Sequence, residues 1–170
     1  MTDLQRAILQ NFDEYVFGFM RSDIDAAIRG NANYLAALGL VSYTEVLGGL
    51  VTGKLGVVGQ SGVNFRAFLP YLGSQYKQLE SKGIDLYDIV RCGLVHNYFI
   101  KGESTIHMHA VAPCGIVASP GGPTYFYVNV YRDHFFAGAA RYRNDILDEP
   151  QPDLALKFQT GMKNIAIKIP

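Results

Sequence analysis

The sequence predicts a mainly helical protein with a small antiparallel sheet, for three reasons. Apolar residues recur at intervals of three and four through most of residues 2–100, which is the period of helices with one buried face. After Lys101 the period becomes two, which is typical of strands. Hydrophobic residues make up 49% of the 170 residues, enough to bury a core. We therefore expect one domain over residues 1–170, built of an antiparallel helical bundle over 1–100, a sheet over 104–131 and C-terminal helices over 132–166.

A long apolar segment is expected to be the central helix of the bundle. Residues 2–20 predict a first helix, after which Asp23 or Asp25 can cap a second helix that continues to Val51. This second helix is apolar on nearly all sides, so it should be buried. Three glycines along it would let another helix approach closely: Gly39, Gly48 and Gly49.

Glycines and capping residues delimit the next helices. Residues 53–62 are rich in glycine and predict a loop. Asn64 is expected to cap a helix from Phe65 to about Ser81, and Asp85 to cap a short helix after it.

Two alternating segments and two helices complete the chain. Thr105–Val111 and Tyr125–Tyr131 alternate between apolar and polar residues and predict strands that must lie against the helices. Asp133 is then expected to cap a helix that runs to Leu147. The last helix is expected to begin at Asp153, after two prolines that end the preceding one: Pro150 and Pro152.

Composition and charge exclude several classes of protein. Fifteen Lys and Arg residues balance fifteen Asp and Glu residues, which argues against a protein dedicated to duplex DNA. Two cysteines, Cys92 and Cys114, are too few for a disulfide framework, and the N-terminus lacks a signal-peptide pattern. Residues 34–51 are long and apolar enough to suggest a membrane span, but Glu45 would be costly inside a bilayer. We therefore expect a cytoplasmic protein with no membrane partner.

The segment with the clearest chemical potential is 85–100, DLYDIVRCGLVHNYFI, which places Arg91 and His96 close together. A guanidinium binds phosphate oxygens through two parallel hydrogen bonds, and an imidazole transfers protons near neutral pH. Together they form a minimal pair for cleaving a phosphodiester without a metal ion. A structural role is the alternative: Arg91 could pair with Asp88 or Glu45, and His96 could be a hydrogen-bonded core residue or a cation at a helix C-terminus.

Arg91–His96, RCGLVH, has an arginine and a histidine separated by four residues and so resembles the motif of the HEPN superfamily. The resemblance implies a helical fold, metal-independent ribonuclease activity of toxin or defence type, and Arg91 and His96 as the catalytic pair. Extended by Asn97 and Tyr98, the segment also resembles toxins whose partner nucleotidyltransferase adds AMP to the tyrosine. Active members usually have a polar residue where this chain has Cys92. The alternative is therefore a non-catalytic module of the same fold that binds a ligand or another protein.

The spacing of the motif also predicts an oligomer. Residues five apart lie about 140° apart around an α-helix, so Arg91 and His96 would not share one face well. The resemblance implies that a two-fold homodimer brings both copies of the motif into one cleft. The expected partners are thus a second copy, RNA or a nucleotide, and a nucleotidyltransferase antitoxin. Glu45 could orient Arg91, Asn97 and Tyr98 could support the cleft, and no cofactor or metal is expected.

Two further clusters are weighed against structural roles. His107 and His109 share a strand face and could bind a metal with His134 or Cys114, although an exposed polar face explains them as well. The second cluster combines tyrosines with the basic segment Arg141–Arg143 and could stack on RNA bases, or simply pack against a helix or a second copy. Its strand tyrosines are Tyr125, Tyr127 and Tyr131.

Overall fold

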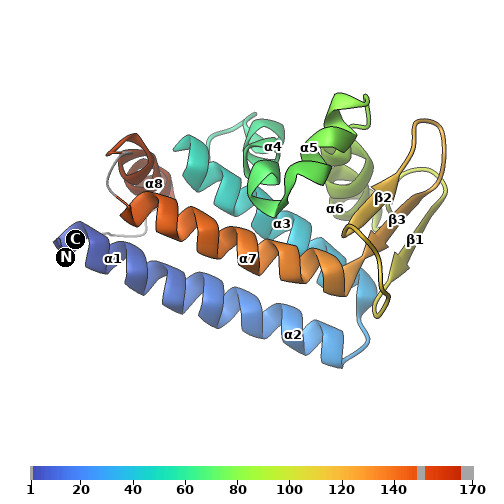
Figure 1. The fold of residues 1–170 in the computed structure, drawn as a ribbon, viewed down its shortest axis with the longest axis horizontal. Coiled ribbons are helices and arrows are strands. Elements are labelled where there is room, and N and C mark those ends of the chain that lie inside the picture. The colour runs from blue at the N-terminus through green and yellow to red at the C-terminus, as the bar shows by residue number, and fades with distance from the viewer. Residues whose placement is uncertain (1, 149–151, 166–170) are drawn as a thin grey trace.

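The computed structural model describes residues 2–148 and 152–165, and it confirms a mainly helical fold with a small sheet (Figure 1). The chain begins with one long helix made of α1 (Asp3–Asn11), the π-helical η1 (Phe12–Met20) and α2 (Arg21–Arg29). The prediction that the first helix ends at residue 20 is wrong, because nothing in the next nine residues breaks a helix. It stops at Gly30 and Asn31, where the positive φ of 55° at Asn31 turns the chain. Asp23 and Asp25 accordingly lie inside α2 and cap nothing.

The helix α3 (Asn33–Thr52) is the central element, as predicted. It packs against α2, α4, α7 and α8, and it ends at Gly53 in the left-handed conformation. Among the described residues it alone is long and apolar enough to cross a membrane, but in this globular fold it is the core helix. A hydrophobic cluster built from α1 through α8 surrounds it.

Gly48 of α3 permits the close approach of another helix that the sequence predicts, and Gly49 permits close approach of the following loop. A Cβ atom on Gly48 would lie 1.7 Å from the backbone oxygen of Asn64, and one on Gly49 would lie 2.8 Å from the Cα of Leu55. The neighbouring helix α4 (Ser61–Leu72) therefore rests directly on the backbone of α3.

The predicted helix over residues 65–81 is two helices, α4 and α5 (Ser74–Ser81). Gly73 separates them with a φ of 142°, a conformation that favours glycine. Asn64 is not a cap but a buried residue of α4. Its side chain accepts a hydrogen bond from the Thr52 hydroxyl at 2.7 Å and donates one to the Lys54 carbonyl at 3.1 Å, which fixes the predicted loop against α3.

The segment with the motif forms η2 (Tyr87–Cys92), a π-helical turn, and α6 (Gly93–Asn97). Asp85 caps it as predicted, since its carboxylate accepts a hydrogen bond from the backbone N–H of Asp88 at 3.0 Å. The helix ends at Tyr98, which is left-handed with a φ of 64°.

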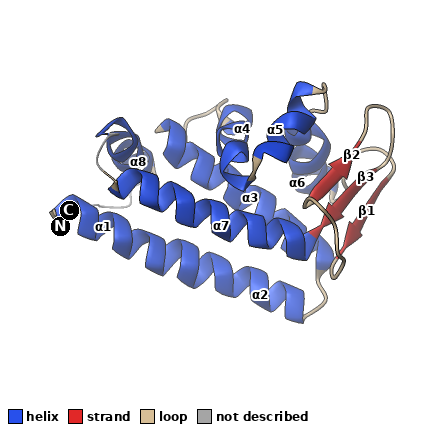
Figure 2. Ribbon diagram, in the orientation of Figure 1, coloured by secondary structure: helices blue, strands red, loops and turns tan. Residues whose placement is uncertain are grey.

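The strands β1 (Ser104–His107), β2 (Ile116–Ala118) and β3 (Thr124–Tyr127) gather at one end of the helices (Figure 2). The strand β3 lies in the middle, antiparallel to β2 but parallel to β1. The prediction of a wholly antiparallel sheet is therefore wrong for the β1–β3 pair. In the chain β2 comes between β1 and β3, but in the sheet it pairs with the edge of β3 opposite β1. The chain runs back along β2 and turns again into β3, so β1 and β3 run in the same direction.

Two C-terminal helices, α7 (Val128–Leu147) and α8 (Pro152–Asn164), complete the fold. The predicted strand end over residues 128–131 and the Asp133 cap are wrong, since α7 already begins at Val128. Helical spacing buries Val128, Tyr131 and Phe135 on one side, whereas β1 offers no partner strand beyond His107. Pro150 is predicted to end the helix before the last one, and residue 166 is the predicted end of the last helix. Both positions lie outside the described residues.

The close packing of α3 on α4 predicts that Gly48→Ala destabilises the protein by about 1–3 kcal/mol, because the added methyl group meets backbone atoms. The matched control is Gly39→Ala in the same helix, where the new Cβ would meet side-chain atoms alone: the terminal Cδ1 of Ile24 at 2.8 Å and Cε2 of Tyr43 at 4.0 Å. The end of the Ile24 side chain can move, and alanine favours the helix. We therefore expect the free energy of unfolding to change by less than about 1 kcal/mol. Urea unfolding followed by circular dichroism measures both, and equal effects of the two substitutions would contradict this packing.

Candidate functional site

The motif segment is held on the core by one row of apolar side chains. Leu86, Val90 and Leu94 recur every four residues and are buried. This packing places Arg91 in η2, directed at α3, and leaves His96 near the free end of α6. A π-helical turn widens the helix locally, and such turns are often found at functional sites.

Arg91 is paired with Glu45 of α3, one of the two partners considered for it. Its Nε lies 2.6 Å from Oε2 of Glu45, and the two side chains are only 16% and 17% exposed. The orientation of the groups does not satisfy hydrogen-bond geometry, so the contact is a close ion pair. The guanidinium also lies 5.6 Å from the centre of the Tyr87 ring. Asp88, the other candidate partner, instead binds Lys101 at 2.6 Å.

The ion pair uses only one edge of the Arg91 guanidinium. Nε is buried, but within residues 2–148 and 152–165 the two terminal nitrogens have no hydrogen-bond partner and are not fully buried. Glu45 therefore holds the Arg91 side chain through Nε and partly neutralises its charge. The terminal nitrogens are the atoms that a guanidinium uses to bind a phosphate or carboxylate group in a bidentate manner.

His96 and Asn97 are exposed at the end of α6. No hydrogen bond joins His96 to Arg91 in the part of the chain that the structure describes. One copy of the chain thus leaves the two predicted catalytic side chains in different settings: Arg91 is held against α3, and His96 faces solvent.

An exposed aromatic cluster follows the motif. The rings of Tyr98 and Tyr34 are stacked with their centres 5.0 Å apart, and Phe99 meets each of them edge-on at 5.7 Å. We call Tyr34, Tyr98 and Phe99 the aromatic ledge. Tyr98 and Phe99 are 60% and 58% exposed although both are large and apolar. Leu35, next to Tyr34 in sequence, and Val95, three residues before Tyr98, are exposed as well. The left-handed backbone of Tyr98 costs about 1–2 kcal/mol for a residue with a side chain.

Sequence reasoning singled out Tyr98 but missed the other two members of the ledge. Phe99 directly follows Tyr98, so an aromatic pair at a helix end was the available signal. Tyr34 lies more than sixty positions earlier, at the start of α3, and no local pattern connects it to the motif.

The predicted metal ligands do not come together. His134 Nδ1 lies 2.7 Å from the Tyr76 hydroxyl, and burial lowers the pKa of His134. Burial also raises the pKa of Cys114, which lies in the core. His107 is stacked on Tyr127 with ring centres 5.1 Å apart. Within residues 2–148 and 152–165, no group of three His, Cys, Asp or Glu side chains is arranged to hold a metal ion.

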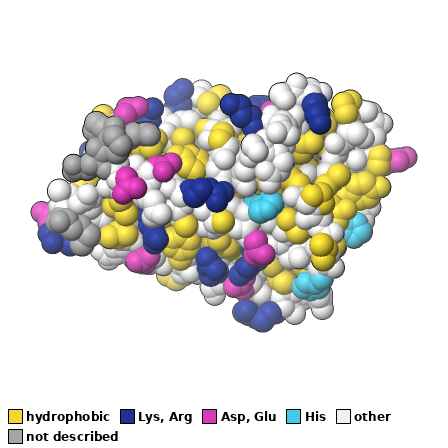
Figure 3. Space-filling view, in the orientation of Figure 1, with side chains coloured by type: hydrophobic (Ala, Val, Ile, Leu, Met, Phe, Trp, Pro, Cys, Tyr) yellow, Lys and Arg dark blue, Asp and Glu magenta, His cyan; other side chains and the backbone are white. Residues whose placement is uncertain are grey.

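Of the two roles considered for the tyrosine cluster, base stacking is excluded for Tyr131, which packs in the core instead. Tyr131 and Tyr142 are completely buried, and the Tyr131 hydroxyl lies 2.9 Å from the Thr44 hydroxyl in the core. Arg141 donates to the Tyr71 carbonyl, and Arg143 pairs with Asp13 at 3.4 Å. Basic and acidic side chains are interspersed on the face seen in Figure 3, without a single basic surface.

Comparison with family models, with curated proteins and with solved structures finds no match to this chain. The assignment of a function therefore depends on the chemistry and geometry of these residues.

The Glu45–Arg91 pair leads to a stability prediction. Glu45→Gln leaves Arg91 charged in a site only 16% exposed, so we expect a loss of about 1–3 kcal/mol in the free energy of unfolding. The matched control is Asp88→Asn, which breaks the pair with Lys101, where the side chains are 51% and 41% exposed, and should cost less than about 1 kcal/mol. Chemical denaturation of both variants provides the comparison. If Glu45→Gln cost no more than the control, Glu45 would not be what holds Arg91.

Proposed function

We propose that this chain is a cytoplasmic, HEPN-like domain that functions as a homodimer and binds RNA or a nucleotide where two copies of the motif meet. One observation carries the proposal: the helix that follows Arg91 ends in an exposed surface formed by His96 and the aromatic ledge. Large uncovered aromatic side chains that follow a candidate phosphate-binding arginine in the chain point to a site that a second molecule completes.

The chemistry of the ledge favours a second copy as its first partner. Its three side chains carry no charge, so two ledges can meet across a two-fold axis without like charges being opposed. The chain has a formal net charge of zero, so its copies do not repel one another as a whole. Such a dimer would bring His96 of each copy towards the shared cleft.

The motif residues then have separate tasks at a bound phosphodiester. The free edge of the Arg91 guanidinium would bind phosphate oxygens while Glu45 fixes its direction. The exposed imidazole of His96 would take the proton from a ribose 2′-hydroxyl or give one to the leaving oxygen. The exposed ring of Tyr98 would shape the cleft with Asn97, and its hydroxyl would be the acceptor if a partner nucleotidyltransferase transferred AMP.

A second candidate is a non-catalytic module of the same fold that binds a ligand or another protein. The Glu45–Arg91 ion pair specifically favours it, because a guanidinium already beside a carboxylate stabilises an additional negative charge less strongly. Cys92 in place of the usual polar residue points in the same direction.

The first prediction concerns the dimer and the part of the surface that holds it together. At micromolar concentration, light scattering should give twice the mass of one chain for the wild type and the single-chain mass for Tyr98→Asn/Phe99→Ser. Asparagine tolerates the left-handed backbone at position 98, so the variant should remain folded. The matched control is Phe19→Ser, an equally exposed phenylalanine on η1, which should remain dimeric. A monomeric wild type, or a dimer that survives loss of the ledge, would contradict this arrangement.

Cleavage distinguishes the two candidate functions. With mixed RNA and excess EDTA, the wild type should produce fragments, and His96→Ala should be slower by about 100-fold or more, the usual contribution of a proton-transferring group. His109→Ala, which removes another exposed histidine, should retain the wild-type rate. Equal product from wild type and His96→Ala would rule out the ribonuclease and leave the binding module. If that module binds RNA, Arg91→Gln should still weaken the binding.

A further inference from the structure

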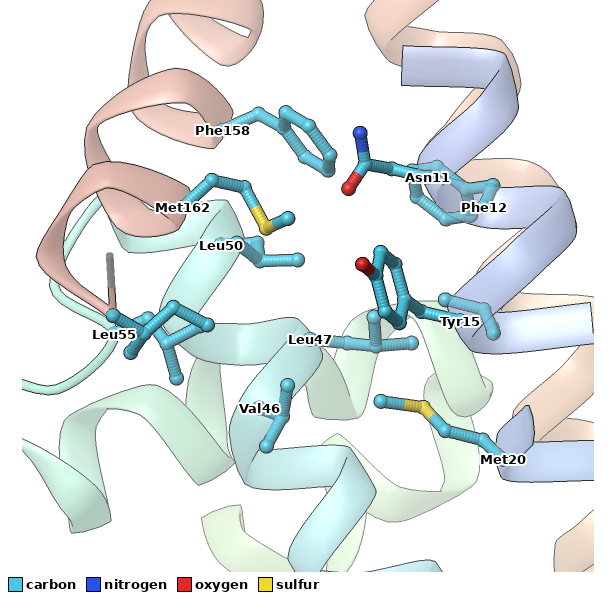
Figure 4. A pocket seen from close by; sticks show the side chains of 12 residues that line it. Asn11, Phe12, Tyr15, Met20, Val46, Leu47, Leu50, Leu55, Phe158 and Met162 are labelled. Carbon is cyan, nitrogen blue, oxygen red and sulfur yellow. The ribbon is translucent and has the colours of Figure 1, made fainter. Parts of the chain in front are cut away.

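An apolar cavity lies between η1, α3 and α8 (Figure 4). Its volume is ≈ 110 Å³. The walls come from segments distant in sequence, and they include Phe12, Val46, Leu47, Leu50, Phe158 and Met162. None of the motif residues lines it, so it is separate from the candidate site described above.

One buried polar atom in the wall lacks a partner among the described residues. The Asn11 side chain donates from Nδ2 to the carbonyl of Ala7 at 2.8 Å. Because a carbonyl can only accept, this bond fixes the orientation of the amide and turns Oδ1 the other way, towards the space between Phe158 and Tyr15 (Figure 4). Oδ1 is buried and has no hydrogen-bond partner among the described residues. A buried acceptor of this kind is uncommon in folded proteins and calls for a donor.

The rest of the lining defines what that donor belongs to. No charged side chain lines the cavity, so a bound molecule would be neutral. The rings of Phe12 and Phe158 are stacked with their centres 5.8 Å apart and form an aromatic part of the wall. A cavity of about 150 Å³ lined by apolar side chains is known to bind benzene, so the present volume limits the occupant to about one ring. The half-buried Tyr15 and the exposed Ile165 place one side of the cavity at the surface.

We infer that this cavity is a binding site for a small neutral molecule with one apolar ring or short chain and a single hydrogen-bond donor, which it donates to Oδ1 of Asn11. The apolar walls supply affinity, and the one buried acceptor supplies selectivity. The inference stands independently of the proposed function, because it uses no residue of the motif.

Phenol and toluene test the inference, because they have nearly the same shape and only phenol carries a donor. Calorimetric titration should show that wild-type protein binds both. Asn11→Leu should weaken the binding of phenol about tenfold and leave that of toluene unchanged or stronger. Val46→Phe, which fills the cavity from a half-buried wall position, should abolish binding of both. Asn144→Leu, at an exposed asparagine on α7 that does not line the cavity, should alter neither.

The wild type also gives a result that does not depend on a variant folding. In ¹⁵N-correlated spectra, phenol should shift the side-chain amide signals of Asn11, and toluene should shift them much less while still moving signals from Leu47 and Leu50. Absence of binding by the wild type would overturn the inference. So would binding that survives Val46→Phe, or an equal loss of phenol and toluene binding in a folded Asn11→Leu variant.

Discussion

The enclosure of α3 is the constraint on which the rest of the structure depends. A helix packed on several sides must be apolar or must pair its polar groups inside the protein, since unpaired buried groups are costly. Thr44 meets this requirement through Tyr131 of α7, and Glu45 meets it through Arg91 of η2. Gly48 removes a side chain where α4 crosses. The same helix that forms the core therefore fixes the position of three neighbours, including the turn with the motif arginine.

The candidate site is a consequence of this enclosure. Glu45 draws Arg91 inward, so one copy of the chain presents the arginine only by its outer edge, while His96 lies beyond it at the exposed end of α6. The uncovered rings of Tyr98 and Phe99 follow directly. Within the described residues of one chain no hydrogen bond joins Arg91 to His96, which is the reason that the proposed function includes a second copy. The apolar cavity beside α8 is a separate product of packing around the same helix.

Local patterns in the sequence were sufficient for features that depend on one segment or on the chemistry of a buried helix. The central helix and its close approach at Gly48 follow from apolar periodicity and small side chains. The cost of a buried charge indicated that Arg91 needs a partner, but it left both Asp88 and Glu45 open, and only the structure selects Glu45. Features set by distant segments were not accessible in this way. Whether Val128 continued a strand or began a helix depended on the length of β1, and the stacking of Tyr34 on Tyr98 depended on how α3 meets α6.

The most direct measurement of the central claim is hydrogen–deuterium exchange of the unmodified protein over a range of protein concentrations. If the motif surface is where two copies meet, amide exchange should slow at residues 93–100 and 33–36 as the concentration rises through the dimerisation range. Residues 12–20, which hold the equally exposed Phe19, should exchange at a constant rate. Exchange that is independent of concentration at residues 93–100, or protection that appears only elsewhere, would contradict the claim.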